Sequence, residues 1–174
     1  MQHAATEFPC SDEPVVATPA IQIRELARGD DATAFRTLNE EWITRFFVLE
    51  PKDRETLNDP EGAILRKGGH IFMVYADAEP VGCVALVPMP NSVYELSKMA
   101  VSPRLRGLGI GRRLLEHAIA QAGLIGAKSL FLGSSTKLKS AVHLYESVGF
   151  THVDPATLPP NPYTRADVFM EMTL

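Results

Sequence analysis

Cysteine is scarce in this chain, which has 174 residues and only two cysteines. Cys83 lies in an apolar segment that predicts a strand, and Cys10 lies in a polar N-terminal stretch, so we expect no disulfide framework. This cysteine usage fits a reducing, cytoplasmic compartment. The first residues, MQHAATEFPCSDEPVV, have no basic start and no apolar run, so we expect no signal peptide.

Long apolar runs and an excess of positive charge are missing as well. No apolar run approaches the roughly 20 residues that a membrane-spanning helix needs. The formal net charge is −4, whereas nucleic-acid-binding domains usually carry a basic face. We therefore expect neither a membrane nor a nucleic acid as partner. The basic residues gather locally between Arg104 and Arg113, which favours a small anionic ligand.

The remaining composition is that of an ordinary globular protein with a substantial core, since 45% of residues are hydrophobic and 22% are charged. Residues 1–19 mix Pro, Ser, Thr and acidic residues without periodicity and predict a flexible N-terminal tail. The length then suits a single domain over residues 20–174.

Hydrophobic periodicity predicts an α/β fold with a mixed sheet covered by helices. Strands are expected at 20–26, at 70–89 as a pair joined by a turn near 77–80, and at 92–101, 128–134, 150–153 and 166–174. Helices are expected at 29–47, within 49–69, from the end of a glycine-rich stretch to about residue 125, and at 140–148. Asp30 or Asp31 is the expected cap of the first helix.

The glycine-rich stretch RLRGLGIGRRLL covers residues 104–115, between a predicted strand and a predicted helix. The first N–H groups of a helix lack intrahelical partners, and the helix dipole there favours negative charge. Glycines at 107, 109 and 111 would let an anion approach those groups, and flanking arginines add positive charge. The stretch predicts a phosphate or pyrophosphate site; the alternative is tight helix–strand packing without a ligand.

Two common phosphate motifs fit this stretch poorly. Dinucleotide-binding folds carry their glycines after the first strand, whereas here they follow the fourth predicted strand. A nucleotide-binding P-loop ends in Gly-Lys-Ser/Thr, whereas this stretch ends in Gly-Arg-Arg.

With these motifs the sequence resembles the GNAT superfamily of acyl-CoA-dependent N-acetyltransferases. Arg104, Gly107 and Gly109 match its signature Arg/Gln-x-x-Gly-x-Gly/Ala. The segment AVHLYESVGF, at 141–150, matches a second family element, Ala-x-x-Leu-Tyr-x-x-x-Gly-Phe. The resemblance covers about residues 20–174. It implies a mixed, mostly antiparallel central sheet of six to seven strands, flanked by helices and splayed between the fourth and fifth strands.

The resemblance also implies acetyl-CoA as cofactor, with its pyrophosphate on the N–H groups of residues 106–111 and its pantetheine arm between 96–101 and 128–133. Many members carry Asn where this chain has Leu138, so Thr136, Ser140 or backbone would supply that contact. The implied cofactor-binding residues are Met99, Ala100, Val101, Arg104, Arg106, Gly107, Leu108, Gly109, Ile110, Gly111, Arg112 and Ser140.

Amide formation from a thioester needs a neutral amine, a polarised carbonyl and a protonated leaving thiolate. The resemblance places a base on the fourth strand, where Glu95 falls, with its pKa raised by burial. Strict alternation would put Glu95, Ser97, Met99 and Val101 on one face. The alternatives are a solvent-facing glutamate or proton removal through water. A backbone N–H near Met99 would polarise the carbonyl.

Tyr145 is the candidate acid for the leaving thiolate, because the resemblance places a tyrosine beside the thioester sulfur. The alternative is a core tyrosine. The five histidines show no metal-ligand spacing, so we expect no metal. The resemblance also places acceptor contacts at Glu41 and Trp42 in the first helix, and at Tyr163 and Arg165 before the last strand.

Together these residues predict an N-acetyltransferase that moves an acetyl group to the primary amine of a small molecule by direct attack in a ternary complex. Acidic residues near the site and Arg165 would suit an amino-acid-like acceptor. Two alternatives remain, an acyl-CoA-binding sensor without transfer and an acetyltransferase for protein N-termini or lysines. A homodimer is expected from the resemblance.

Overall fold

The computed structural model describes residues 17–174, so most of the expected tail over 1–19 lies outside the described residues. The strands are β1 (Ile21–Glu25), β2 (His70–Ala76), β3 (Glu79–Pro88), β4 (Val93–Val101), β5 (Ser129–Ser134), β6 (Thr151–His152) and β7 (Val168–Thr173). The helices are α1 (Thr33–Phe46), α2 (Pro51–Asn58), α3 (Pro60–Ala63), α4 (Ile110–Leu124) and α5 (Lys139–Val148). Short 3₁₀ turns lie at Leu65–Lys67, Pro90–Ser92, Pro103–Leu105 and Pro155–Thr157.

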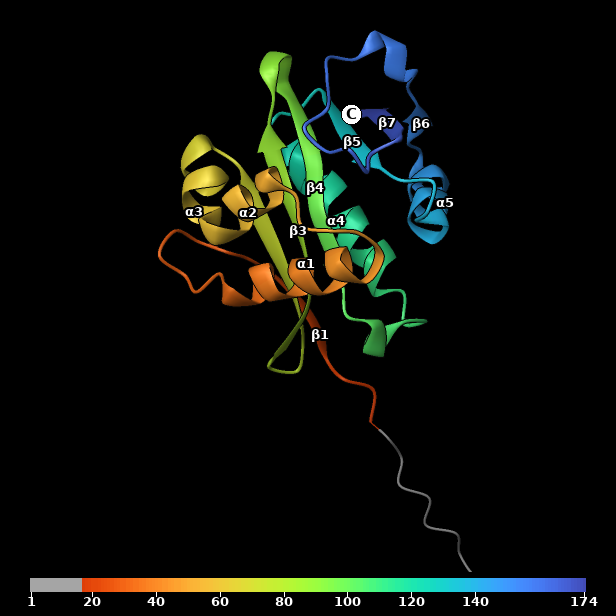
Figure 1. The fold of residues 1–174 in the computed structure, drawn as a ribbon. Coiled ribbons are helices and arrows are strands. Elements are labelled where there is room, and N and C mark those ends of the chain that lie inside the picture. The colour runs from red at the N-terminus through yellow and green to blue at the C-terminus, as the bar shows by residue number, and fades with distance from the viewer. Residues whose placement is uncertain (1–16) are drawn as a thin grey trace, which may run out of the picture.

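The strands form one seven-stranded sheet in the order β1-β2-β3-β4-β5-β7-β6 (Figure 1). All neighbours are antiparallel except β4 and β5, which run parallel. Their pairing extends only from Val93 opposite Ser129 to Glu95 opposite Phe131, although both strands continue further. The sheet therefore splays between its fourth and fifth strands, and the expected fold class is confirmed.

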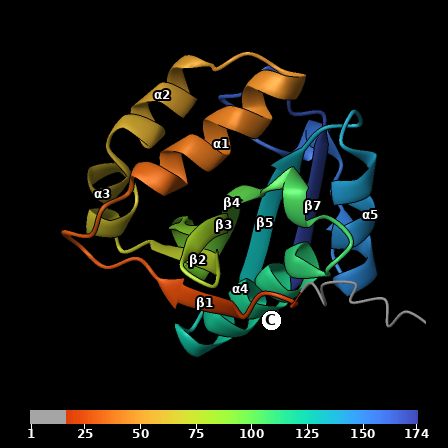
Figure 2. The same ribbon diagram turned by 90° about the horizontal axis from the view of Figure 1, so that it is seen from below.

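Helices cover both faces of the sheet, with α1 and α2 on one side and α4 on the other (Figure 2). Phe35 and Ile43 of α1 are fully buried in a cluster with β2 and β3. Leu114 and Leu115 of α4 are fully buried in the cluster on the opposite face, where residues of α5 also pack. The apolar spacing of each helix thus selects the face that it buries.

A β-bulge interrupts β4 at Lys98, which has a positive φ of 53°. Cys83 lies opposite Ala100 and Ala85 lies opposite Ser97, so β4 advances by three residues over the length in which β3 advances by two. The extra residue reverses the alternation. Ala100 packs with the α1 cluster, while Leu96, Met99 and Val101 pack with the α4 cluster.

The expected common face of Glu95, Ser97, Met99 and Val101 is therefore wrong. Glu95 and Ser97 flank Leu96, which faces the α4 cluster, so they project to the side of α1 and α2. Met99 and Val101 project to the opposite side, because they follow the bulge.

The cap expected for the first helix is also different. The helix begins at Thr33 after Ala32, with no side-chain cap. The carboxylate of Asp31 instead accepts hydrogen bonds from the N–H and the hydroxyl of Thr33, at 2.9 and 2.6 Å. Asp30 accepts from the N–H of Ala27 at 2.8 Å and so closes the preceding turn.

Candidate active site

A cavity of about 190 Å³ opens beside β4 and β5, just beyond their last paired residues. Both expected catalytic residues, Glu95 and Tyr145, line this cavity. Three of the four expected acceptor residues, Trp42, Tyr163 and Arg165, line it too. We call it the central cavity. The gap in the sheet thus brings together side chains from α1, β4, α5 and the segment before β7.

Glu95 is half-buried at the end of the paired segment of β4. Burial raises the pKa of its carboxyl, and the positive charges of Lys98 and Lys52 oppose this shift without reversing it. A carboxylate with a raised pKa is a stronger base than a solvated one, so this position suits proton removal from an amine.

Tyr145 comes from α5, and its ring packs edge-on against Phe150 with 5.9 Å between ring centroids. Burial raises the pKa of its hydroxyl to about 12. The phenol therefore stays protonated near neutral pH and can donate a proton or a hydrogen bond into the central cavity.

The loop before α4 has the geometry that an anion site needs. Gly107 and Gly109 have positive φ values of 82° and 69°, which a residue with a Cβ rarely adopts. No atom lies within 4 Å of a Cβ built at either glycine, so the surface above them is open. Gly109 caps α4 and no side chain satisfies the first N–H groups of the helix, so these remain available to an anion.

Gly111 differs from the two glycines before it. A Cβ at this position would lie 3.6 Å from Leu144 of α5 and 4.0 Å from Met99 of β4. These are ordinary packing distances. A Cβ would therefore be accommodated at Gly111, so packing does not require a glycine there, whereas the positive φ values at Gly107 and Gly109 favour glycine.

The arginines around this loop are placed differently from one another. Arg104 forms an ion pair with Glu79. Arg112 donates a hydrogen bond to the hydroxyl of Ser147 at 2.7 Å, which joins α4 to α5. Arg113 donates to the carbonyl of Ile21 at 3.3 Å. Arg106 is exposed and borders a shallow hollow beside α1.

Glu41 is the one expected acceptor residue that does not line the central cavity. It is exposed on α1 and borders the same shallow hollow as Arg106. Trp42, its neighbour, does reach the central cavity, and its indole N–H donates to the Asn39 side-chain oxygen at 3.1 Å. Successive residues of a helix point about 100° apart, which explains this separation.

Leu138 lines the central cavity at the position where Asn is frequent in the family. Of its two suggested replacements, Thr136 is held by Asp167, which accepts from its N–H at 2.7 Å and its hydroxyl at 2.8 Å. Ser140 is exposed at the start of α5. A backbone group is the remaining suggested source of this contact, unless the contact is absent.

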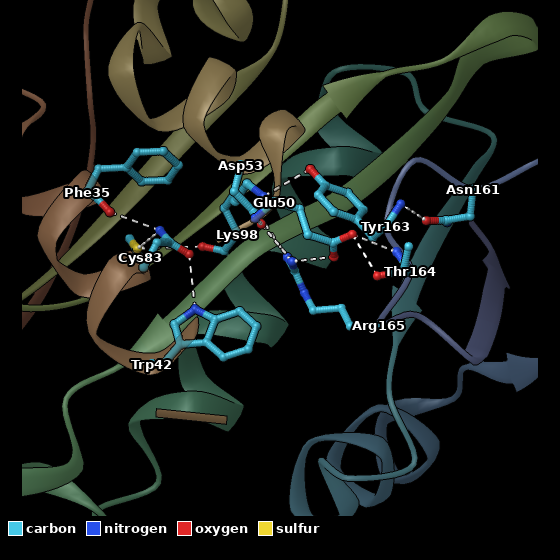
Figure 3. A network of polar contacts seen from close by, with 11 residues as sticks. Phe35, Trp42, Glu50, Asp53, Cys83, Lys98, Asn161, Tyr163, Thr164 and Arg165 are labelled. Atoms are coloured by element: carbon cyan, nitrogen blue, oxygen red, sulfur yellow. Dashed lines mark hydrogen bonds and ion pairs between the residues drawn. The ribbon is translucent and has the colours of Figure 1, made fainter. Parts of the chain in front are cut away.

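A buried polar network, which the sequence did not reveal, lies on the α2 side of the central cavity (Figure 3). The Lys98 ammonium donates to Asp53 at 2.7 Å and to the hydroxyl of Tyr163 at 3.0 Å. Arg165 donates to both carboxylate oxygens of Asp53, at 2.6 and 2.8 Å, and to Glu50 at 3.0 Å. Glu50 also accepts from the N–H and hydroxyl of Thr164.

This network fastens three segments that are distant in the sequence: the start of α2, the bulge of β4 and the loop before β7. It fixes Tyr163 and Arg165 at the wall of the central cavity. The lysine in the middle of an expected strand was the one signal in the sequence for it, since a lysine is seldom fully buried without a partner.

Within residues 17–174, no three His, Cys, Asp or Glu side chains gather closely enough to hold a metal ion. In the same part of the chain, no helix is long and apolar enough to cross a lipid bilayer.

The comparisons with known proteins agree with this fold. Residues 35–150 match the model of the acetyltransferase (GNAT) family. The chain is 37% identical to the uncharacterized N-acetyltransferase YjgM of Escherichia coli K12, over 81% of this chain and 88% of that protein. The chain therefore belongs to the GNAT family of N-acetyltransferases.

Solved structures share its architecture. A GNAT-family acetyltransferase from Staphylococcus aureus Mu50 superimposes with a TM-score of 0.79 at 24% identity, covering 88% of this chain and 99% of that one. A GNAT-family acetyltransferase from Elizabethkingia anophelis with acetyl-CoA bound superimposes with a TM-score of 0.66 at 22% identity, covering 88% and 98%. At these identities the likeness shows the fold.

Proposed function

We propose that this enzyme transfers the acetyl group of acetyl-CoA to the primary amine of a small molecule, by direct attack in a ternary complex. The observation that carries this proposal is that Glu95 and Tyr145 line one cavity where β4 and β5 separate. A base and an acid that line one cavity are what amide formation from a thioester requires.

The cofactor residues proposed are those of the β4 exit and of the loop before α4. The open N–H groups from Gly107 to Gly111 would hold the pyrophosphate, and the end of β4 would line the pantetheine arm. The Elizabethkingia protein, which shares this fold, binds acetyl-CoA. Acetyl-CoA supplies an activated acyl carbonyl, and the chain supplies position and proton transfer.

In the proposed reaction Glu95 accepts a proton from the acceptor ammonium, directly or through water. The neutral amine then attacks the carbonyl, which a backbone N–H of β4 near Met99 polarises. As the carbon–sulfur bond breaks, Tyr145 donates its hydroxyl proton to the leaving sulfur and regains a proton from the nitrogen of the tetrahedral intermediate, directly or through water. The raised pKa values of both groups support these roles, since one favours proton uptake and the other keeps a proton available.

The charges around the central cavity favour a cationic acceptor. Lys98 and Arg165 are both paired with Asp53, and Arg165 is also paired with Glu50. These four charges cancel, which leaves the carboxylate of Glu95 as the unbalanced charge. The carboxylate of an amino-acid-like acceptor would bind the Arg165 guanidinium, which also pairs with Asp53 and Glu50.

The test is release of the CoA thiol from acetyl-CoA across a panel of amino acids, polyamines, aminoglycosides and short peptides. A Cys10→Ser variant removes the thiol outside the described residues, and Cys83 is buried with its pKa raised to about 12 by that burial. Amine-dependent release supports the proposal. Binding of acetyl-CoA by calorimetry without release for any amine would instead support the sensor, and preference for peptides would support a protein acetyltransferase.

A further inference from the structure

A second cavity, of about 450 Å³, lies against the proline-rich segment between the 3₁₀ turn at Pro155–Thr157 and β7. Its walls are mainly apolar and include Phe131, Phe169, Met89, Pro159, Pro160 and Pro162. The rings of Phe131 and Phe169 are stacked, with 6.2 Å between centroids and 11° between planes. Its volume lies within the range of about 300 to 1,000 Å³ that is usual for small-molecule sites. We call it the apolar cavity.

The apolar cavity adjoins the central cavity through two shared side chains. Glu95 and Asn161 line both. Glu95 pairs with Phe131 at the last paired position of β4 and β5, so the proposed base stands at the boundary between the two cavities. An amine placed beside this carboxylate can therefore extend its substituent into the apolar cavity.

The charges of the apolar cavity restrict that substituent. Its ionisable lining residues are Glu95 and Glu171, both acidic. A carboxylate or phosphate placed there would face like charge in a partly desolvated site, which is unfavourable. Besides these two acids, the polar lining side chains are Asn91, Asn161 and Ser129, and the remaining lining side chains are aromatic, aliphatic or proline. The lining is instead suited to an aromatic or branched aliphatic group.

We propose that the apolar cavity is the acceptor side-chain site, and that the acceptor is a primary amine carrying an aromatic or branched aliphatic group. This inference rests on the proposed function, because it places the reacting amine beside Glu95. Selectivity of this kind is substantial, since one methylene in an apolar pocket changes specificity by about 10- to 200-fold.

Two experiments test it. The first compares kcat/KM for 2-phenylethylamine, isoamylamine, methylamine and ethanolamine, and we expect at least about a tenfold preference for the first two. The second uses Ser129→Phe, which projects a ring into the apolar cavity from its β5 wall. This variant should raise KM for 2-phenylethylamine at least about tenfold while leaving KM for acetyl-CoA and for methylamine unchanged. Gln22→Phe, at an exposed position of β1 and outside both cavities, is the matched control.

Equilibrium binding separates this inference from the proposed function. Calorimetry of 2-phenylethylamine in the presence of CoA should show binding that Ser129→Phe weakens and Gln22→Phe preserves, whether or not transfer occurs. Acetyl transfer that favours methylamine or ethanolamine and that Ser129→Phe does not affect would contradict the proposed acceptor site in the apolar cavity. The proposed acetyltransferase function would still hold. Absence of transfer with Ser129-dependent binding would overturn the proposed function and leave the site.

Discussion

The Lys98 ammonium lies 2.7 Å from the Asp53 carboxylate, and these two side chains are 4% and 0% exposed. The pair joins the bulge of β4 to the first turn of α2, and Arg165 completes it from the loop before β7. Burial of so much charge is favourable only when each group keeps a partner. The wall of the central cavity therefore depends on every member of the network.

Replacing Lys98 by Met should leave the Asp53 carboxylate buried with one cation fewer. We expect Lys98→Met to lower the free energy of unfolding by about 3 kcal/mol, measured by urea denaturation. Lys52→Met is the control, because the Lys52–Glu55 pair is exposed and should contribute about 1 kcal/mol or less. Equal losses in the free energy of unfolding for the two variants would contradict the larger contribution expected from the buried pair.

The stability of the protein should depend on the ionisation of Asp53 in acid. Burial alone would raise the pKa of this carboxyl, but hydrogen bonds from Arg165 and Lys98 outweigh burial and lower it from 3.8 to about 2. A depressed pKa stabilises the folded state above pH 4, and this contribution disappears as the pH falls towards 2. The advantage of wild type over Asp53→Asn should shrink by about 2 kcal/mol across that window.

This comparison uses urea unfolding at several pH values between 2 and 6. A difference between wild type and Asp53→Asn that stays constant over that range would show that Asp53 does not titrate between folded and unfolded states.

Glu95→Gln separates catalysis from stability. We expect kcat to fall by about 10²- to 10⁴-fold, with loss of the acid limb that reflects the raised pKa of Glu95. Because folding raises the pKa of the Glu95 carboxyl, ionisation of this group lowers the free energy of unfolding as the pH rises towards the folded-state pKa. The neutral amide of the Glu95→Gln variant should therefore not destabilise the protein at pH 7. A pH–rate profile and a urea titration measure the two effects. An unchanged pH–rate profile would exclude Glu95 as the base.

Tyr145→Phe tests the proposed acid. The pKa of about 12 means that the wild-type hydroxyl remains protonated through the working range, so no alkaline limb near neutral pH should come from it. We expect kcat to fall by about 10²-fold, while the Kd for acetyl-CoA in calorimetry stays nearly unchanged. A kcat equal to that of wild type would indicate that Tyr145 packs against Phe150 and is not the acid.

Gly109→Glu should weaken CoA binding, because it places a carboxylate where the phosphates are expected and strains a positive φ. Loss of hydrogen bonds to a charged group corresponds to a 10- to 100-fold weaker Kd, as an order of magnitude. Gly126→Glu is the control, since Gly126 also has a positive φ and open space but lies at the far end of α4. Comparable CoA affinity in both variants would show that the CoA phosphates bind at another place than the loop before α4.

Much of this architecture was predictable because its signals are local. Apolar periodicity placed the strands and helices within a few residues, and the glycine stretch located the start of α4. The spacing of the two motifs identified the family and with it the splayed sheet. The bulge at Lys98 escaped prediction, because the adjacent polar residues Ser97 and Lys98 break the alternation at one point only and the residues opposite them on β3 are set by register.

The sequence by itself determined the family, the order of the elements and the glycine-rich loop before α4, since each depends on residues close together in the chain. Only the tertiary structure decided that Glu41 faces away from the central cavity, that Asp53 and Lys98 pair, and that Glu95 adjoins an apolar cavity. These relations join residues far apart in sequence. They are set by sheet register and by the packing of α2 and the loop before β7, which no local pattern encodes.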